Sequence, residues 1–125
     1  MTKISIIDNH VSKKLQISLE GHSGYADAGE DIVCSAISVL SQAIFNGITE
    51  VLKYDISYKV QDGYFYFEIP DSMLKQDSRV KALLDTFVLN LKDLEIQYKD
   101  YIKLCIEEVH WCFVSIFNFL RVKKG

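Results

Sequence analysis

The chain has little cysteine, little proline and no excess of basic residues. Its three cysteines are odd in number and unrelated in spacing, which is not the pattern of a disulfide framework. With one proline and 49% apolar residues, the chain is expected to be neither disordered nor of low complexity. No signal peptide is recognisable, because Met1 to Lys3 lead directly into a strand pattern. We therefore expect a reduced, cytoplasmic protein.

Charge and hydrophobic runs exclude two further classes of protein. The formal net charge of −3 argues against binding nucleic acid directly through a basic face, and it suits a cationic partner better. The longest apolar run, Val109 to Leu120, contains three polar residues and is too short to cross a bilayer, so no transmembrane segment is expected. A chain of 125 residues is long enough to bury one core.

The apolar periodicity predicts an α+β fold with the element order ββαββαβ. Its two layers are a mainly antiparallel sheet and two long helices packed against it. The alternating and helical patterns place these elements at residues 1–20 (a hairpin of two strands), Ile32 to Val51, Ile56 to Val60, Tyr64 to Ile69, Val80 to Tyr98 and Ile102 to Ile106. Asp77 or Ser78 is expected to cap the second helix. Gly47, inside the first helix, suggests a close approach by a neighbouring element.

The stretch from Gly21 to Cys34, GHSGYADAGEDIVC, connects the first hairpin to the first helix. It holds three of the six glycines and places His22 and Cys34 at the two ends of one loop. An imidazole and a thiol in this arrangement are what a cysteine nucleophile with a histidine base needs. Cys34 as an ordinary buried core residue is the competing interpretation.

The start of the first helix has two interpretations. Asp31 can cap it by accepting the N–H of Cys34, which puts the thiol in the first turn among unpaired N–H groups that can bind an oxyanion. Alternatively, Asp27 and Glu30 form a capping box one turn earlier. Either aspartate, Asp31 first and Asp27 second, is also a candidate to orient His22.

Three other groups of residues have a functional and a structural interpretation. Ser38 and Ser41 follow Cys34 along one helix face and either line a cleft or permit close packing. The aromatic residues Tyr64 to Phe67 either contact a substrate or reflect ordinary strand propensity. Cys105, His110 and Cys112 are of metal-ligand types, but their spacing fits no zinc pattern, so no metal or other cofactor is expected. His10 is expected to be a solvated turn residue.

The stretch GHSGYADAGEDIVCSAISVLSQAIFNGITEVL resembles the signature of the bacterial ribosomal-processing cysteine protease family, Prp. The matching features are Gly21-His22, the glycine-containing loop, and Asp31 to Ala36 at the opening of a helix. Chain length and element order also agree, so the resemblance covers about residues 1–108. It leaves residues 109–125 as an apolar C-terminal tail of unknown role.

The resemblance implies a cysteine endopeptidase with His22 and Cys34 as its catalytic dyad. It also implies a homodimer, and a substrate that is the N-terminal extension of a large-subunit ribosomal protein, removed during ribosome maturation. The loop with Ser23, Gly24, Tyr25 and Gly29 is expected to be mobile and to order around the substrate. The alternative is a non-catalytic, ribosome-associated binding module in which Cys34 is structural.

Overall fold

The computed structural model describes residues 1–21 and 28–110 of the chain. Their helices and strands are, in chain order, β1 (Thr2–Asn9), β2 (Lys14–Glu20), α1 (Ala28–Asn46), a π-helical turn (Gly47–Val51), β3 (Tyr58–Gln61), β4 (Tyr64–Pro70), α2 (Asp71–Gln76), α3 (Ser78–Gln97) and β5 (Ile102–Val109). The expected order ββαββαβ is confirmed. The π-helical turn and the short helix α2 are two described elements that the sequence analysis did not predict.

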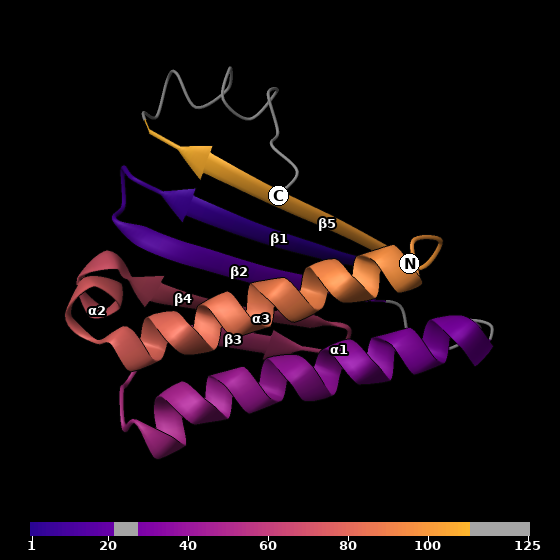
Figure 1. The fold of residues 1–125 in the computed structure, drawn as a ribbon, viewed down its shortest axis with the longest axis horizontal. Coiled ribbons are helices and arrows are strands. Elements are labelled where there is room, and N and C mark those ends of the chain that lie inside the picture. The colour runs from indigo at the N-terminus through magenta and orange to yellow at the C-terminus, as the bar shows by residue number, and fades with distance from the viewer. Residues whose placement is uncertain (22–27, 111–125) are drawn as a thin grey trace.

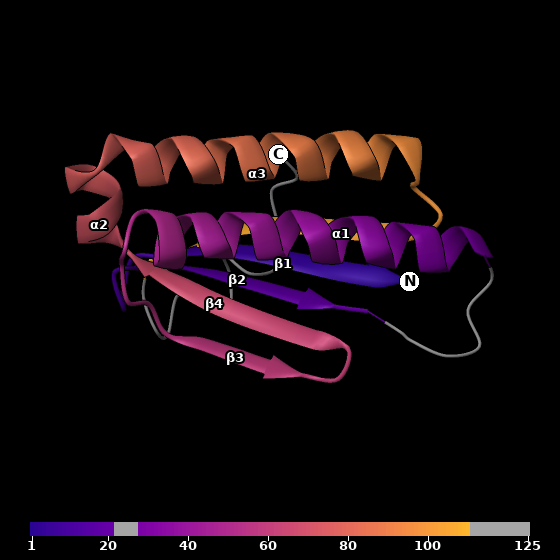
Figure 2. The same cartoon turned by 90° about the horizontal axis from the view of Figure 1, so that it is seen from below.

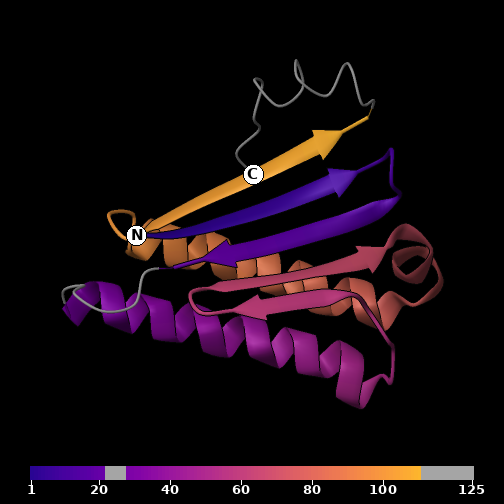
Figure 3. The ribbon, with the colours of Figure 1, turned by 180° about the vertical axis from the view of Figure 1, so that it is seen from behind.

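The five strands form one sheet in the order β3-β4-β2-β1-β5. All neighbours are antiparallel except β1 and β5, which are parallel, so the expected mainly antiparallel sheet is confirmed. Both long helices, α1 and α3, cover the same face of the sheet (Figures 1 and 2). Figure 3 shows the other face, over which none of the described helices lies. The domain therefore has the predicted two layers.

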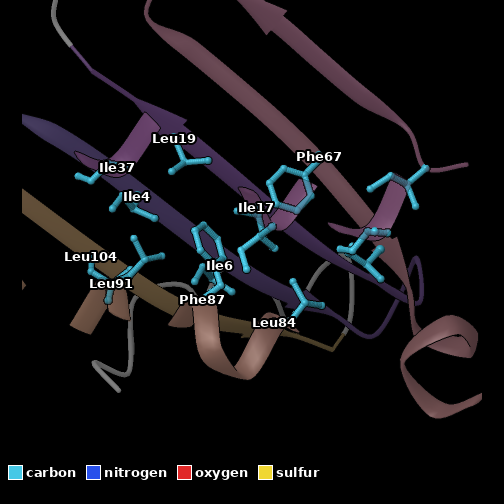
Figure 4. Close-up of a cluster of buried hydrophobic side chains, with 14 of the residues drawn as sticks. Ile4, Ile6, Ile17, Leu19, Ile37, Phe67, Leu84, Phe87, Leu91 and Leu104 are labelled. Carbon is cyan, nitrogen blue, oxygen red and sulfur yellow. The ribbon is translucent and has the colours of Figure 1, made fainter. Parts of the chain in front are cut away.

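The core lies between these two layers. Alternate residues of the central strands point toward the helices, because successive side chains of a strand face opposite sides. Figure 4 shows side chains of the sheet packed against those of α3. The most completely buried of the large side chains are Ile4, Ile17, Phe67, Ile69, Val33, Ile48, Val80, Phe87 and Leu91.

The helix α1 begins about a turn before the residue that we expected to cap it. Asp31 is the fourth residue of α1 and is exposed, so its prediction as N-cap is wrong. Gly29, expected in the mobile loop, belongs to the first turn instead. A Cβ atom at Gly29 would lie 2.9 Å from the hydroxyl of Tyr101, so glycine lets this turn pass beneath that ring. The rival cap, Asp27, lies outside the described residues.

The end of α1 approaches α3 closely, as the glycine in this helix suggested. A Cβ atom at Gly47 would lie 3.2 Å from Leu83 of α3. By length and composition alone, the stretch Asp31–Val51 could cross a membrane. The apolar stripe of this stretch packs against the sheet and α3, because Val33, Ile37 and Ile48 are buried in the core. A long core helix has the same composition, so this stretch does not point to a membrane span.

Asp77 caps α3, as expected, and is the centre of a polar cluster. Its carboxylate accepts the N–H of Arg79 at 2.9 Å, two bonds from the Arg79 guanidinium at 3.0 and 2.7 Å, and the hydroxyl of Tyr54 at 2.7 Å. These bonds, above all those from the guanidinium, hold the pKa of Asp77 well below its ordinary value. The cluster joins the start of α3 to the segment that follows α1.

We expect the Asp77→Asn variant to melt several degrees below the wild type at neutral pH. Because folding lowers the pKa of Asp77, its charge stabilises the fold above the ordinary pKa of 3.8 and loses this effect as the pH falls below that value. Thermal melts from pH 7 to pH 2 should show the difference between the two proteins shrinking below about pH 3.8. Asp85→Asn, at an exposed ion pair with Lys81, is the control and should change the melting temperature little. A difference in melting temperature that does not change with pH would contradict the stabilising role of the Asp77 charge.

Candidate active site

Four elements meet around a cleft at one end of the sheet. They are the start of β1, the end of β2, the tip of the β3–β4 hairpin and the part of α1 from Cys34 to Gln42. The cleft has a volume of about 340 Å³. It is lined by Thr2, Leu19, Glu20, Gly21, Cys34, Ile37, Ser38, Ser41, Gln42, Val60, Gln61, Gly63, Tyr64 and Phe65. Cys34 is therefore placed where a bound chain can reach it.

The thiol of Cys34 is half-buried and contacts β1. Its Sγ lies 3.0 Å from Oγ1 of Thr2, a hydrogen bond in which either atom can be the donor. The end of β2 also passes close by, because a Cβ atom at Gly21 would lie 3.4 Å from Sγ of Cys34. The sulfur is thus held between a hydroxyl and a glycine backbone. Cys34 is therefore neither fully exposed nor fully buried, and it is one of the residues that line the cleft.

Thr2 is a site residue that the sequence analysis missed. It is buried, and its backbone N–H donates to the carbonyl of Tyr101 at 2.8 Å, which fixes the start of β1. The signal was present in the alternation of β1, because Thr2 shares the face of Ile4 and Ile6, which point toward the helices. Only the packing of α1 on the sheet shows that Cys34 is the helix residue opposite it.

Two glycines fix the end of β2, directly before His22. The N–H of Gly21 donates to the carbonyl of Gly63 at 2.9 Å. Gly63, in the turn between β3 and β4, has a φ of +71°, and a Cβ atom there would lie 2.7 Å from the carbonyl oxygen of Gly21. The hairpin tip can therefore touch the end of β2 only if residue 63 is glycine.

The helix side of the cleft carries both serines of the predicted face. Ser38 is exposed, whereas Ser41 is buried and its hydroxyl donates to the carbonyl of Ile37 at 2.5 Å. The hydroxyl of Ser41 therefore has its hydrogen-bond partner within the helix, and the small side chain leaves room on the cleft wall. The prediction that these two serines line a cleft is confirmed, and both side chains are small enough to leave the cleft open.

The aromatic strand contributes to the cleft only at its start. Tyr64 and Phe65 line the cleft, whereas Phe67 is fully buried in the core. The hydroxyl of Tyr66 donates to Glu68 at 3.0 Å. Burial, and then this carboxylate, raise the pKa of Tyr66. Of the four aromatic residues, two are therefore in place to contact a bound peptide.

Several predicted site residues lie outside the described part of the chain. These are His22, Ser23, Gly24, Tyr25 and Asp27. The prediction that unpaired N–H groups surround Cys34 and can bind an oxyanion is wrong, because α1 begins at Ala28 and Cys34 lies in its second turn. The unpaired N–H groups of an α-helix belong to its first four residues, here 28–31, so they do not surround the thiol.

We expect Gly63→Ala to lower both stability and any activity of the site. A side chain at positive φ, together with the contact to Gly21, should cost about 1–2 kcal/mol of unfolding free energy. Urea denaturation measures this loss. Asp62→Ala, at the neighbouring turn residue without a positive φ, is the matched control and should change stability by less than half as much. Equal effects would mean that the contact between the two glycines is not important.

Comparisons with known proteins agree with this geometry. The sequence model of the family described as cysteine protease Prp matches residues 1–103. The ribosomal processing cysteine protease Prp of Bacillus subtilis (strain 168) is 28% identical over 108 residues, covering 83% of this chain and 96% of that protein. The match therefore includes Cys34 and every element that lines the cleft.

Solved structures share the fold. The ribosomal processing protease Prp of S. aureus in complex with a substrate peptide superposes with a TM-score of 0.72 at 22% identity, covering 86% of this chain and all of that one (100%). The same S. aureus protease with a covalently linked product peptide gives a TM-score of 0.69 at 23% identity, with coverages of 86% and 100%. With its thiol in an accessible cleft and the family match over most of its length, this chain belongs to the cysteine protease Prp family.

Proposed function

We propose that this protein is a cytoplasmic endopeptidase that removes the N-terminal extension of a large-subunit ribosomal protein, with Cys34 as nucleophile and His22 as base. The observation that carries the proposal is the position of Cys34. In a chain of a cysteine protease family, its sulfur lies against the wall of a cleft formed by four elements. Related proteases named for ribosomal processing support the substrate. No cofactor is needed for this chemistry.

The proposed reaction is a two-step acyl transfer. Sγ of Cys34 attacks the scissile carbonyl carbon while its proton passes to the imidazole of His22. The tetrahedral intermediate collapses, the C–N bond breaks, and the leaving amine takes the proton from the imidazolium. Water, deprotonated by the same imidazole, then attacks the thioester carbonyl, the C–S bond breaks, the carboxylic acid product leaves, and the imidazolium returns its proton to the sulfur of Cys34. The S. aureus protease with a covalently linked product peptide supports a covalent intermediate of this kind.

Thr2 is the positioning residue in this scheme. Its hydroxyl is fixed by the buried start of β1 and lies 3.0 Å from the sulfur. It can donate to the thiolate, which holds the sulfur in one rotamer facing the cleft. Asp31, exposed one turn before Cys34, adds a negative charge to this region. Its role in orienting His22 stays a prediction, because His22 lies outside the described residues.

The substrate class follows from what lines the cleft. Glu20 supplies a negative charge beside the thiol, and Tyr64 and Phe65 supply aromatic surface. These groups suit an extended, lysine-bearing peptide with aromatic residues before the scissile bond. We propose that the residues 22–27 between β2 and α1, with Gly29 at the start of the helix, complete the site around such a peptide. The protease domain is assigned to residues 1–108, and residues 111–125 of the proposed tail lie outside the described residues.

Cys34→Ala and His22→Ala should each abolish cleavage while leaving the fold intact. The nucleophile is lost in the first variant, and the thiol keeps its proton in the second. Mass spectrometry of a peptide with adjacent phenylalanines before the cut measures this directly. Cys34→Ser should be nearly inactive too, since a hydroxyl is much harder to ionise. Full turnover by either alanine variant would exclude the dyad.

Two controls complete this experiment: a peptide with alanines in place of the phenylalanines, and Cys105 as a second thiol to compare with Cys34. Replacing the phenylalanines with alanines should slow cleavage, and equal turnover would remove the support for the ribosomal substrate. Iodoacetamide should modify Cys34 much faster than Cys105, which is also half-buried, so exposure alone does not explain a difference. Equal rates would favour the alternative, a ribosome-associated binding module in which Cys34 is structural.

We also propose that the protein acts as a homodimer through α1 and β3. These neighbouring elements share a ring contact of 5.1 Å between Phe45 and Tyr58, and both carry large exposed apolar side chains. The exposed residues on these two elements are Ile32, Val39, Tyr58 and Val60. Large exposed apolar side chains such as these are typical of an interface.

Val39→Glu should shift the protein from dimer to monomer in sedimentation velocity. Val39 is 71% exposed on α1, and a charge there opposes burial of the surface. Leu89→Glu on α3, where the leucine is 60% exposed, is the matched control and should leave the dimer unchanged. A wild type that sediments as a monomer, or equal effects of the two substitutions, would contradict the proposed interface.

A further inference from the structure

Two histidines lie side by side at the end of the sheet remote from Cys34. His10 and His110 each come one residue after a strand, β1 and β5, and these two strands run parallel with Asn9 opposite Val109. The backbone N–H of His10 donates to the carbonyl of Val109 at 2.6 Å, which carries the pairing past the end of β1. The imidazole rings are stacked with centroids 4.4 Å apart and an interplanar angle of 1°.

Each histidine has a carboxylate two residues before it on its own strand. Residues two apart on a strand share a face, and Asp8 and Glu108 are themselves register partners. Nε2 of His110 lies 3.1 Å from Oε2 of Glu108, and Nε2 of His10 lies 3.4 Å from Oδ2 of Asp8. The parallel register therefore brings two imidazoles and two carboxylates into one cluster.

Three of these side chains converge as metal ligands do. One ligand atom from each of His10, Glu108 and His110 lies within 4.8 Å of the others. Zinc bound at about 2.0–2.2 Å in tetrahedral geometry separates its ligand atoms by roughly 3.3 Å. The side chains are 40% to 53% exposed, so rotations about their own bonds can close the remaining gap without moving the strands.

We propose that His10, His110 and Glu108 bind a divalent transition metal ion, zinc in particular, with water in the fourth position. Two imidazoles and one carboxylate select zinc over magnesium and calcium, which prefer oxygen ligands only. Asp8, whose Oδ2 lies 3.4 Å from Nε2 of His10, accepts a hydrogen bond from that nitrogen and orients the ring, which leaves Nδ1 of His10 for the metal. The catalytic proposal uses none of these residues, and Glu108 and His110 lie beyond the residues that the family model matches.

The place of the site in the sheet indicates what the ion does. Thr2, at the cleft, and His10 are eight residues apart on one strand, which at about 3.3 Å per residue separates them by roughly 26 Å. The ion therefore takes no part in the chemistry of Cys34. It cross-links β1 to β5, the only parallel pair in the described sheet, and stabilises the fold by binding the native state alone.

Isothermal titration calorimetry with zinc chloride tests the proposal on the full chain. We expect one zinc ion per chain and a rise in melting temperature on binding. His10→Asn, His110→Asn and Glu108→Gln should each weaken binding at least tenfold. Cys34→Ala is the matched control for adventitious binding at the catalytic thiol, and Glu50→Gln, at an exposed carboxylate elsewhere, is the control for nonspecific binding. Neither control should change the affinity.

Cobalt substitution gives a second measurement on the unmodified protein. An imidazole and carboxylate site should give visible bands without the intense near-ultraviolet band of a cobalt–thiolate bond. The proposal is overturned if zinc does not bind, if the histidine variants keep the wild-type affinity, or if binding is lost in Cys34→Ala. A thiolate band that accounts for all the bound cobalt would also overturn it, since the ion would then be bound by a cysteine.

Discussion

The side-chain alternation of β1, fixed by its register between β2 and β5, is the constraint on which most of this structure depends. Its even-numbered residues share one face: Thr2 contacts the thiol, Ile4 and Ile6 form the core, and Asp8 lies opposite Glu108 of β5. A shift of one residue would turn all of them to the other face of the sheet. Burial of the two isoleucines, worth about 1.5–3 kcal/mol each, opposes such a shift and therefore holds both ends of the strand in place.

The elements could be predicted from the sequence because their signals are local. Alternation identifies the strands, a period of three to four identifies the helices, and Asp77 marks the start of α3. The start of α1 is not where Asp31 as a cap predicts it, because the first turn, 28–31, holds no large apolar residue and the apolar stripe that marks a helix begins only at Val33. The short helix α2 follows Pro70 directly and is too short to show a period. Its start at Asp71 is tied to the first hairpin, since the N–H of Asp71 donates to the carbonyl of Lys13.

The contacts that make the site could not be predicted, because they join residues far apart in the chain. Thr2 meets Cys34 across 32 positions, and His10 meets His110 through a parallel pairing that no local pattern encodes. Gly29 is predicted from the sequence to belong to a mobile loop, and Gly21 only to precede His22. In the structure both are places where a side chain would press on a neighbour, respectively the sulfur of Cys34 and the ring of Tyr101. Glycine did mark positions that matter for the structure, but glycine is needed there because the chain packs closely against a neighbour.

The position of Cys34 in the second turn of α1 changes how its reactivity must be explained. The partial positive charge of a helix N-terminus falls off within the first turn, so the helix supports a thiolate at residue 34 less than it would at residue 31. One hydrogen-bonding group at the sulfur is the hydroxyl of Thr2, at 3.0 Å. A neutral hydroxyl orients the sulfur but is not basic enough to take the proton of the thiol. In the proposed mechanism that proton must therefore go to His22, and the two contacts of Gly63 with Gly21 are what fix the strand end from which His22 follows.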